Sequence, residues 1–478
     1  MAGNEFERIT PAQAGLDPRC IINMMDRMEK EKINITSFVL LRHGKILCEA
    51  YYEPYEKDQL RTVFSLSKTF TSMAIGIADG EGKINLDEKI TDLFAEEIEK
   101  GQIPVGKELA SLTIRHLLRM STGQEHEPNR GESDWNDMAT AFLSTPFHEM
   151  PGEVFRYNSM ATYMLSASLK KKGIDLEEYL EEKLLTPMGI TGTRWLRDPR
   201  GICTAGFGFS LYPEVIAKLG QMILQGGMWN GKQLVPKTYI EMATSKQIEN
   251  GDDPASDWAQ GYGYQMWRCK NNAVRGDGMY GQFCMIHKET DTVLAMTAVT
   301  GDMQGEMNVY YEEVLLHYQD QPLAEDEEAM KALNKRLAAL HYTRPLPEDD
   351  GSKLPEKLKK LELPLADFFD LTLSCENDLI TLTDKEGEIR YLAGRAEWKK
   401  TCRKVHCTPL YTKKDQVDTL VIGAWGMKAG SLVIKVYEIE MLEEDTLTLT
   451  PEEDGVQVKL VNTTIPSQPN EYISTVIQ

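Results

Sequence analysis

The hydrophobic pattern of this chain changes at a proline-rich stretch, and that change constrains the fold more than any other feature. The stretch is Arg344-Pro-Leu-Pro-Glu-Asp-Asp-Gly-Ser-Lys-Leu-Pro355, and its prolines, glycine and acidic residues favour a linker. After it, short runs alternate apolar and polar residues, as strands do. Before it, runs with a helical period are mixed with strand-like runs. We therefore expect a mixed unit over residues 1–320, a helix and linker over 321–363, and a separate all-β barrel or sandwich over 364–478.

Residues 1–320 carry strand patterns at both ends and helical patterns between them. Two apolar runs turn at His43-Gly44-Lys45 and predict a hairpin over 38–48. Further strands are expected at 261–267, 281–287 and 292–299, and helices at 65–80, 112–120, 135–143, 160–172, 176–185, 215–225 and 308–318. This order predicts an α+β fold. One antiparallel sheet, closed by the two ends of the unit and flanked by helices, would carry a helical subdomain at about 87–200.

The remainder of the chain predicts a small all-β C-terminal domain that follows a charged helix. The helix is expected over 324–341, with acidic residues at its start and basic residues near its end, as the helix dipole favours. About seven strands should follow, at 369–374, 379–383, 389–392, 419–424, 432–438, 446–450 and 456–461.

The charge of the chain excludes some partners. Lys and Arg number 53 and Asp and Glu number 74, a formal net charge of −21, which repels a phosphate backbone, so we expect no nucleic acid partner. No apolar run approaches the ~20 residues that cross a bilayer, so we expect no membrane contact. The first residues lack the basic and apolar regions of a signal peptide, and we expect a cytoplasmic protein. The oligomeric state stays open.

The eight cysteines show no paired spacing, so we expect reduced and mostly buried thiols. Cys402, His406 and Cys407 lie close together, but no second pair completes a set of four metal ligands. We interpret them as core residues of a strand-rich segment and expect no metal and no organic cofactor.

The residues with the clearest chemical potential are Ser65 and Lys68 in Phe64-Ser-Leu-Ser-Lys68. A spacing of three residues places both on one helix face, with Cβ atoms about 5–6 Å apart. A serine hydroxyl becomes a good nucleophile when a neighbouring base takes its proton. A second Ser-x-x-Lys, Ser168-Leu-Lys-Lys171, lies late in its helix, where we expect a solvated C-terminal turn.

The sequence around Ser65 resembles the nucleophile motif of the penicillin-recognising serine hydrolases. This superfamily includes class C β-lactamases, D-alanyl-D-alanine carboxypeptidases and related esterases and amidases. Three further segments resemble family motifs in the right order over residues 8–320: Thr113 to Gly123, Tyr157-Asn158-Ser159, and Gly278-Met279-Tyr280-Gly281-Gln282. The resemblance implies the β-lactamase/transpeptidase-like fold and does not cover the segment after residue 364.

The resemblance also implies catalytic roles. Ser65 would be the acylated nucleophile, and Lys68 would accept its proton. Tyr157 would be the second acid–base group, which passes the proton to the leaving group and helps to activate the deacylating water, as a phenolate or through Lys68. The backbone N–H groups of Ser65 and Gln282 would form the oxyanion hole.

Two positions depart from the family pattern. Ser159 replaces the usual Asn, and its shorter hydroxyl could still bond Lys68 or the substrate. Met279 replaces the usual Lys or His, which binds a substrate carboxylate, and we interpret it as a soft wall of an apolar pocket. Arg275, four residues upstream, is the candidate that could stand in for that cation.

Three further residues complete the expected substrate-binding set: Tyr280 and Gly281 in the third motif, and Trp135 in the helical subdomain. The expected function is hydrolysis of a small ester or amide through an acyl-enzyme. A β-lactamase or D-Ala-D-Ala carboxypeptidase and a non-catalytic ligand-binding protein on the same fold are the alternatives.

Overall fold

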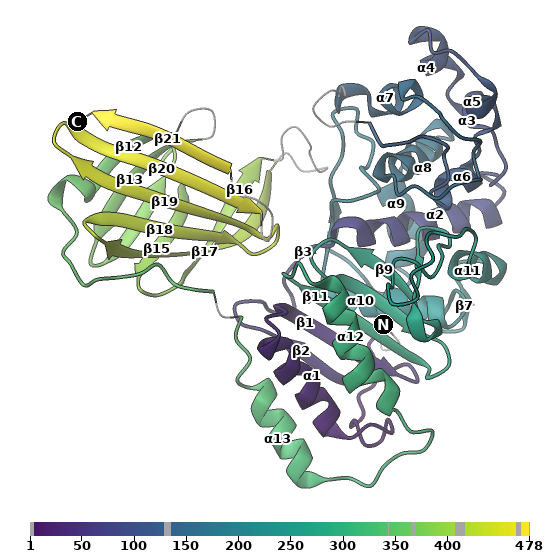
Figure 1. The fold of residues 1–478 in the computed structure, drawn as a ribbon, viewed down its shortest axis with the longest axis horizontal. Helices are drawn as coiled ribbons and strands as arrows, with labels where there is room; N and C mark the ends of the chain where they lie inside the picture. The colour runs from purple at the N-terminus through teal and green to yellow at the C-terminus, as the bar shows by residue number, and fades with distance from the viewer. Residues whose placement is uncertain are drawn as a thin grey trace. The chain divides into compact units, whose positions relative to one another are not determined.

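The computed structural model describes residues 4–128, 135–342, 344–365, 369–406, 416–464 and 470–477. The chain forms two compact units, the first ending at His341 and the second beginning at Tyr342 (Figure 1). Among the described residues, no helix combines the length and the apolar character that a membrane crossing requires.

The first unit is built on an antiparallel sheet whose described strands have the order β2-β1-β11-β10-β9-β8. Its strands are β1 (Ile35–Arg42), β2 (Lys45–Tyr51), β8 (Trp267–Arg268), β9 (Val274–Gly278), β10 (Gln282–His287) and β11 (Thr292–Ala298). The hairpin of β1 and β2 confirms the predicted turn, in which His43 and Gly44 both have positive φ. Because β1 pairs with β11, the two ends of the unit close the sheet, as the sequence predicted.

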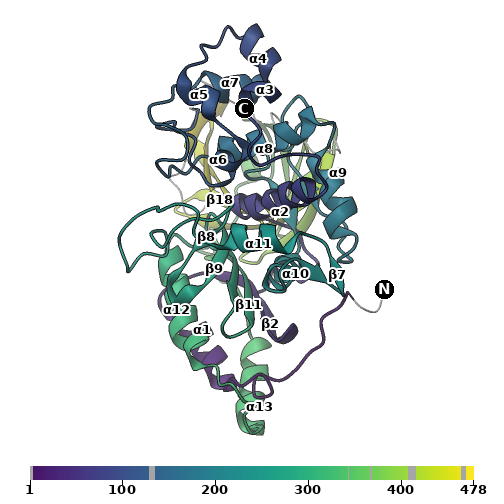
Figure 2. The same cartoon turned by 90° about the vertical axis from the view of Figure 1, so that its right-hand side faces the viewer.

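Helices cover both faces of this sheet (Figure 2). α1 (Pro18–Lys30) and α12 (Met303–Glu313) pack together on one face, and α10 (Pro213–Leu224) lies on the other face against β1, β10 and β11. α2 (Ser67–Gly80) runs between the sheet and the helical subdomain, and ten of its residues from Ser67 to Gly76 are buried. The middle of the first unit is therefore a continuous apolar core with α2 at its centre.

The remaining elements of the first unit are short. The helices are α3 (Ile90–Leu93), α4 (Ala95–Lys100), α5 (Lys107–Ser111), α6 (Ile114–Leu118), α7 (Met138–Ser144), α8 (Ser159–Lys171), α9 (Leu176–Leu180), α11 (Lys237–Thr244) and α13 (Glu327–Leu337). Single turns of other helix types are η1 (Phe64–Leu66), η2 (Trp135–Asp137), η3 (Glu181–Leu185), η4 (Lys270–Asn272) and η5 (Leu315–His317). Small strands are β3 (Arg61–Thr62), β4 (Arg194–Trp195), β5 (Phe209–Leu211), β6 (Met228–Trp229) and β7 (Lys232–Gln233).

Three expectations for the first unit were wrong. The strand expected at 261–267 is reduced to β8, and the strand beside it is β9, whose sequence Val-Arg-Gly-Asp-Gly lacks the apolar alternation of a strand although all five residues are buried. The helix that we expected at 308–318 is α12, which begins at Met303 and is capped by Asp302. Ser168 is fully buried and bonds the carbonyl of Met164, because its helix packs into the core, so it is not part of a solvated turn.

The boundary between the units lies at a different place from the expected helix and linker over 321–363. Helix α13 packs on α1 and belongs to the first unit, where Arg336 pairs with Asp26 and Glu29. The proline-rich stretch packs on the second unit, where Asp349 binds Arg395 and the backbone N–H of Met427. Ion pairs and backbone bonds, which composition does not reveal, tie both flanks to their own unit.

The second unit is an all-β sheet. Its described strands are β12 (Lys360–Leu365), β13 (Phe369–Glu376), β14 (Leu379–Thr383), β15 (Ile389–Arg395), β16 (Lys399–His406), β17 (Gln416–Lys428), β18 (Ser431–Glu438), β19 (Glu443–Glu452), β20 (Gly455–Thr464) and β21 (Asn470–Ile477), with the single turn η6 (Glu356–Leu358) before them. All neighbouring strands pair antiparallel except β15 and β17. The two ends of the path, β12 and β21, contact each other, so the sheet curls toward a barrel.

One face of this sheet forms a second apolar core that includes Leu373, Trp425, Ile434 and Leu449. The sequence predicted seven of the described strands and missed β12, β16 and β21. Cys402 on β16 is exposed, so its interpretation as a core thiol was wrong. Its side chain lies on the outer face because the period of a strand places neighbours on opposite faces. Cys407 lies outside the described residues.

Candidate active site

Ser65 lies in the single 3₁₀ turn η1, and the α-helix that we expected to begin there begins two residues later. Phe64 has a φ of +45°, a conformation that costs energy for a residue with a Cβ atom. Ser67 holds the turn, because its hydroxyl donates to the carbonyl of Phe64 at 2.6 Å and accepts from the backbone N–H of Phe209 at 3.1 Å. The strained turn thus presents Ser65 at the edge of α2, and sequence reasoning missed the supporting role of Ser67.

Lys68 points back at Ser65 from the first turn of α2. Its side chain is 2% exposed, and its Nζ donates to Ser65 Oγ at 3.0 Å, Ser159 Oγ at 3.2 Å and the carbonyl of Gly206 at 2.7 Å. These three acceptors come from three separate segments of the chain. They fix the amine within proton-transfer distance of the Ser65 hydroxyl.

Tyr157 completes this group from the loop before α8. Its ring lies 4.8 Å from Lys68 Nζ, and the Ser65 side chain is among the groups that act on the pKa of its hydroxyl. The ring stacks on Trp267 with centroids 5.5 Å apart and an angle of 21° between the planes. Although the ring is partly open to solvent, desolvation of the hydroxyl group is the largest influence on its pKa and, with the nearby charge of Asp277, raises it well above the ordinary value. The phenol therefore holds its proton.

Ser159 is the first residue of α8, and its hydroxyl accepts a hydrogen bond from Lys68. Asn158 caps the helix, because its side chain accepts from the backbone N–H groups of Met160 and Ala161. The backbone N–H of Ser159 donates to Glu127 Oε2 at 2.8 Å. The sequence analysis did not single out Glu127, which contributes a negative charge near Tyr157.

Strand β9 passes directly against the Ser65 turn. A Cβ atom at Gly278 would overlap the carbonyl oxygen of Val63, and one at Gly276 would overlap Leu66 and Thr69. Only glycine permits this approach. Gln282 begins β10 and pairs with Gly278, so its backbone is held beside the same turn, and its side chain bonds the carbonyls of Met279 and Ala298.

The other residues of the third motif form the turn between β9 and β10. Tyr280 and Gly281 have positive φ, and the Tyr280 ring meets Phe64 edge to face at 5.4 Å. Met279 is 55% exposed at the tip of this turn, and its expected role as a wall of an apolar pocket stays a prediction. A tight turn points its outer side chain into solvent. The side chain of Trp135 lies outside the described residues.

Arg275 does not offer a free cation. Its side chain is fully buried and is held by Asp277 at 2.9 Å and by the carbonyl of Asp257 at 2.8 Å. The guanidinium stacks on Trp258 and Trp267. It lies behind the aromatic ring against which Tyr157 packs.

Within the described ranges, one set of side chains has the spacing of metal ligands: Asp175, Glu177 and Cys203. A guanidinium already occupies this position, since Arg197 binds Asp175 at 2.7 Å and Glu177 at 2.6 Å. Burial raises the pKa of the Cys203 thiol, which disfavours the thiolate that a metal would need. We assign no metal role to this set.

The segment that carries Ser65, Lys68 and Tyr157 matches a known protein family. Residues 23–317 match the family model described as Beta-lactamase. This chain belongs to the beta-lactamase family. It is a serine hydrolase of that family. A relative, the 6-aminohexanoate-dimer hydrolase of Paenarthrobacter ureafaciens, is 24% identical over 311 residues, which cover 60% of this chain and 78% of that protein.

Solved structures confirm the predicted β-lactamase-like fold. A penicillin-binding protein homologue from Caulobacter crescentus has a TM-score of 0.51 and 14% identity, and the match covers 62% of this chain and 98% of that one. A family VIII carboxylesterase has a TM-score of 0.50 and 15% identity over 62% of this chain and 97% of that one. An octameric penicillin-binding protein homologue from Pyrococcus abyssi, with a TM-score of 0.50 and 16% identity, covers 95% of this chain and 99% of that one. That likeness extends into the second unit.

Proposed function

We propose that this serine hydrolase cleaves small, uncharged esters or amides through an acyl-enzyme at Ser65. The observation that carries the proposal is the contact between Lys68 Nζ and Ser65 Oγ at 3.0 Å, with the Tyr157 ring 4.8 Å from the same amine. A relative named as a 6-aminohexanoate-dimer hydrolase and a structural neighbour named as a carboxylesterase support amide and ester bonds as the bonds cleaved.

In the proposed acylation, Ser65 Oγ attacks the carbonyl carbon of the substrate while its proton passes to Lys68. The oxyanion forms near the backbone N–H groups of Ser65 and Gln282, which stabilise the charge that develops in the transition state. The proton then moves through Tyr157 to the leaving alcohol or amine as the bond to the carbonyl carbon breaks. The acyl group stays on Ser65 and one neutral product leaves.

Deacylation reverses these roles. A water molecule attacks the acyl carbon and gives its proton to Lys68. The bond between the acyl carbon and Ser65 Oγ then breaks, the proton returns to Oγ, and the carboxylic acid leaves. Because desolvation raises the pKa of Tyr157, we propose that Tyr157 relays a proton as a neutral phenol and does not act as a stable phenolate. Lys68 is then the base in both half-reactions.

The cleft charges favour neutral substrates over the carboxylates of penicillins and acyl-D-Ala-D-Ala peptides. Met279 supplies no cation, Arg275 is buried and paired, and Glu127 adds a negative charge. A β-lactamase or a carboxypeptidase is therefore the less favoured alternative. A purely binding role is also less favoured, because Ser65, Lys68 and Tyr157 are brought together.

Intact mass spectrometry tests the proposal. The protein is incubated in turn with a fluorophosphonate, p-nitrophenyl acetate and a penicillin, and the mass gain is mapped. We expect a fluorophosphonate adduct on Ser65, a transient acetyl adduct, and no penicillin adduct. Ser65→Ala should abolish labelling and turnover, whereas Ser168→Ala, the second Ser-x-x-Lys, should retain both. If Ser65→Ala keeps more than a few per cent of turnover, the assignment of the nucleophile is wrong.

A further inference from the structure

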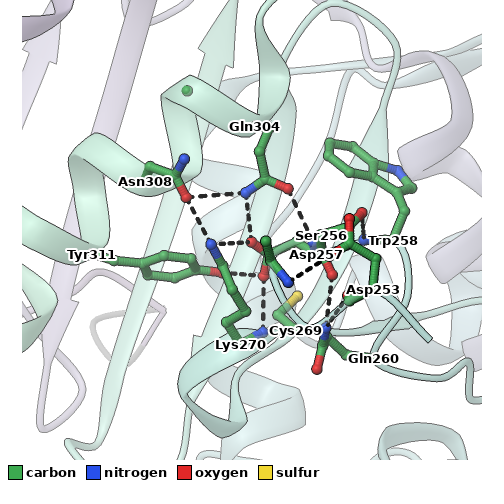
Figure 3. Close-up of polar contacts among 12 residues, drawn as sticks. Asp253, Ser256, Asp257, Trp258, Gln260, Cys269, Lys270, Gln304, Asn308 and Tyr311 are labelled. Atoms are coloured by element: carbon green, nitrogen blue, oxygen red, sulfur yellow. Dashed lines mark hydrogen bonds and ion pairs between the residues drawn. The ribbon is translucent and has the colours of Figure 1, made fainter. Parts of the chain in front are cut away.

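A buried polar network that includes Lys270, Gln304 and Tyr311 is centred on Asp257 (Figure 3). Asp257 is 0% exposed. Its carboxylate accepts from the backbone N–H of Lys270 at 2.8 Å, the Tyr311 hydroxyl at 2.9 Å and Gln304 Nε2 at 2.7 Å, with Lys270 Nζ at 3.5 Å. A buried carboxylate with this many donors is rigidly held.

The network fixes a segment that has little regular structure of its own. Residues 245–266 join α11 to β8 without a helix or strand among them. Gln260 ties the segment to itself by donating to the carbonyls of Asp253 and Ser256. Gln304 on α12 accepts from the backbone N–H of Asp257 at 2.9 Å while donating to its carboxylate. Asp257 thus joins the segment to α12 and η4 through hydrogen bonds (Figure 3).

Arg275 connects Asp257 to the aromatic residues that pack against Tyr157. The backbone carbonyl of Asp257 accepts from Arg275 Nη1 at 2.8 Å, and the next residue, Trp258, covers the guanidinium at 4.5 Å. The guanidinium also lies 5.4 Å from the ring centroid of Trp267, and Trp267 stacks on Tyr157. Each group in this series is packed against the next.

We propose that Asp257 is a positioning residue for the hydrolytic reaction, which holds Arg275 and Trp258 so that Trp267 supports Tyr157 in its productive orientation. The inference rests on the proposed function, because it assumes that Tyr157 moves a proton. Loss of the Asp257 contacts would let Trp258 and Trp267 shift, and Tyr157 would shift with them. A small displacement of a catalytic group can lower the rate by up to about 100-fold. The effect should fall on kcat, since Asp257 itself does not reach the cleft.

A double-mutant cycle on p-nitrophenyl acetate hydrolysis tests this role. Asp257→Asn keeps the shape of the side chain but cannot accept all its hydrogen bonds, and we expect kcat to fall about tenfold with KM within about twofold. In a Tyr157→Phe background, the same substitution should change the residual rate by less than about twofold, because the group it positions has already lost its hydroxyl. Equal losses in both backgrounds would show that Asp257 does not act through Tyr157.

Asp198→Asn is the matched control. Asp198 is also 0% exposed and accepts from a tyrosine hydroxyl, that of Tyr163 at 2.7 Å, and from backbone N–H groups, but it lies in the helical subdomain. A similar loss of kcat in Asp198→Asn would overturn the proposal, because any buried aspartate would then have the same effect.

If Asp257→Asn does not fold, Tyr311→Phe takes its place, since it removes one hydrogen bond to Asp257. We expect the loss of kcat in Tyr311→Phe to be smaller and to vanish in the Tyr157→Phe background, and an undiminished loss there refutes the role. These outcomes are separable from the proposed function, which Ser65→Ala and the comparison of ester with penicillin hydrolysis test independently of Asp257.

Discussion

The two units of this protein differ in where their buried polar groups lie. In the first unit, fully buried charged or polar side chains lie around Ser65, including Lys68, Asp257 and Arg275, and most of them are bonded. In the second unit, the inner face of the sheet is mainly apolar, with Trp425 and Ile434 among its core residues. Burying polar groups is costly unless they are paired. The comparison therefore locates the chemistry in the first unit.

The second unit also contains polar groups, among them a cluster of carboxylates at the start of β19. Glu443 on β19 lies opposite Glu438 on β18, and Asp445 lies two residues further along β19. Arg403 binds Glu438 at 2.7 Å and also the Tyr391 hydroxyl. Burial and the neighbouring carboxylates raise the pKa of Glu443 to about 7 and also raise that of Asp445. We therefore expect these groups to affect the stability of the second unit.

The largest expected effect is a loss of kcat, which we expect for substitutions in the first unit and not for a substitution in the second. Lys68→Ala or Tyr157→Phe should lower kcat by about 10²–10⁴, as for general acid–base groups. The double variant should lose far less than the product, because the two residues act on one proton path. Tyr391→Phe, at a buried tyrosine of the second unit, should leave kcat unchanged. Losses that multiply in a steady-state cycle would contradict a shared path.

A second prediction concerns how the unfolding free energy of the second unit depends on pH. The folded state raises the pKa of Glu443 from 4.5 to about 7, so it favours the protonated form. The resulting stabilisation is complete at pH values below 4.5, the pKa in the unfolded chain, and it is lost as the pH rises through 7. A shift of this size corresponds to about 3 kcal/mol at most.

Urea unfolding at pH 5 and pH 8 measures this effect. We expect Glu443→Gln to reduce the loss of unfolding free energy between these values, whereas Glu453→Gln, at an exposed turn, should not. An unchanged pH dependence in Glu443→Gln would show that Glu443 is not the group responsible.

A third prediction concerns substrate charge in the first unit. A charge-assisted hydrogen bond to a substrate carboxylate is worth about 1.5–3 kcal/mol, or roughly 10–100-fold in selectivity. Neutral short-chain esters or amides should therefore have a kcat/KM at least about tenfold above that of penicillins, and Met279→Lys should narrow the gap. Efficient hydrolysis of penicillins by the unmodified protein would favour the β-lactamase alternative.

The smallest expected effect is on activity after the units are cut apart. Residues 351–353 are exposed, and we expect limited proteolysis to cut first within 344–355. Both pieces should stay folded, and the rate of ester hydrolysis should stay within about twofold, if each unit folds independently. First cuts within residues 1–320, with this stretch resistant, would contradict the division.

The sequence located elements well where one physical signal dominates. In the second unit, the alternation of apolar residues placed β14 and β18, because a half-buried strand needs an apolar residue at every second position. In the first unit, the spacing of Ser65 and Lys68 placed both on one face of a turn, and the structure brings Tyr157 to them from a segment about 90 positions away.

The sequence failed where tertiary contacts replace the local signal. β9 was missed because its glycines serve the close approach to Val63 and its charged residues, Arg275 and Asp277, satisfy each other inside the fold. Neither property shows in a hydrophobic pattern.

The sequence by itself determined the family, the two-part organisation and the identity of the residues that can carry the chemistry, because these depend on local spacing and residue type. Only the tertiary structure decided that Arg275 is enclosed beside Asp257, that Met279 is exposed, and that Glu127 binds the backbone of Ser159. The physical reason is that burial and pairing depend on neighbours far away in the chain. Residue type sets what a side chain can do, and its surroundings set whether that capacity is available.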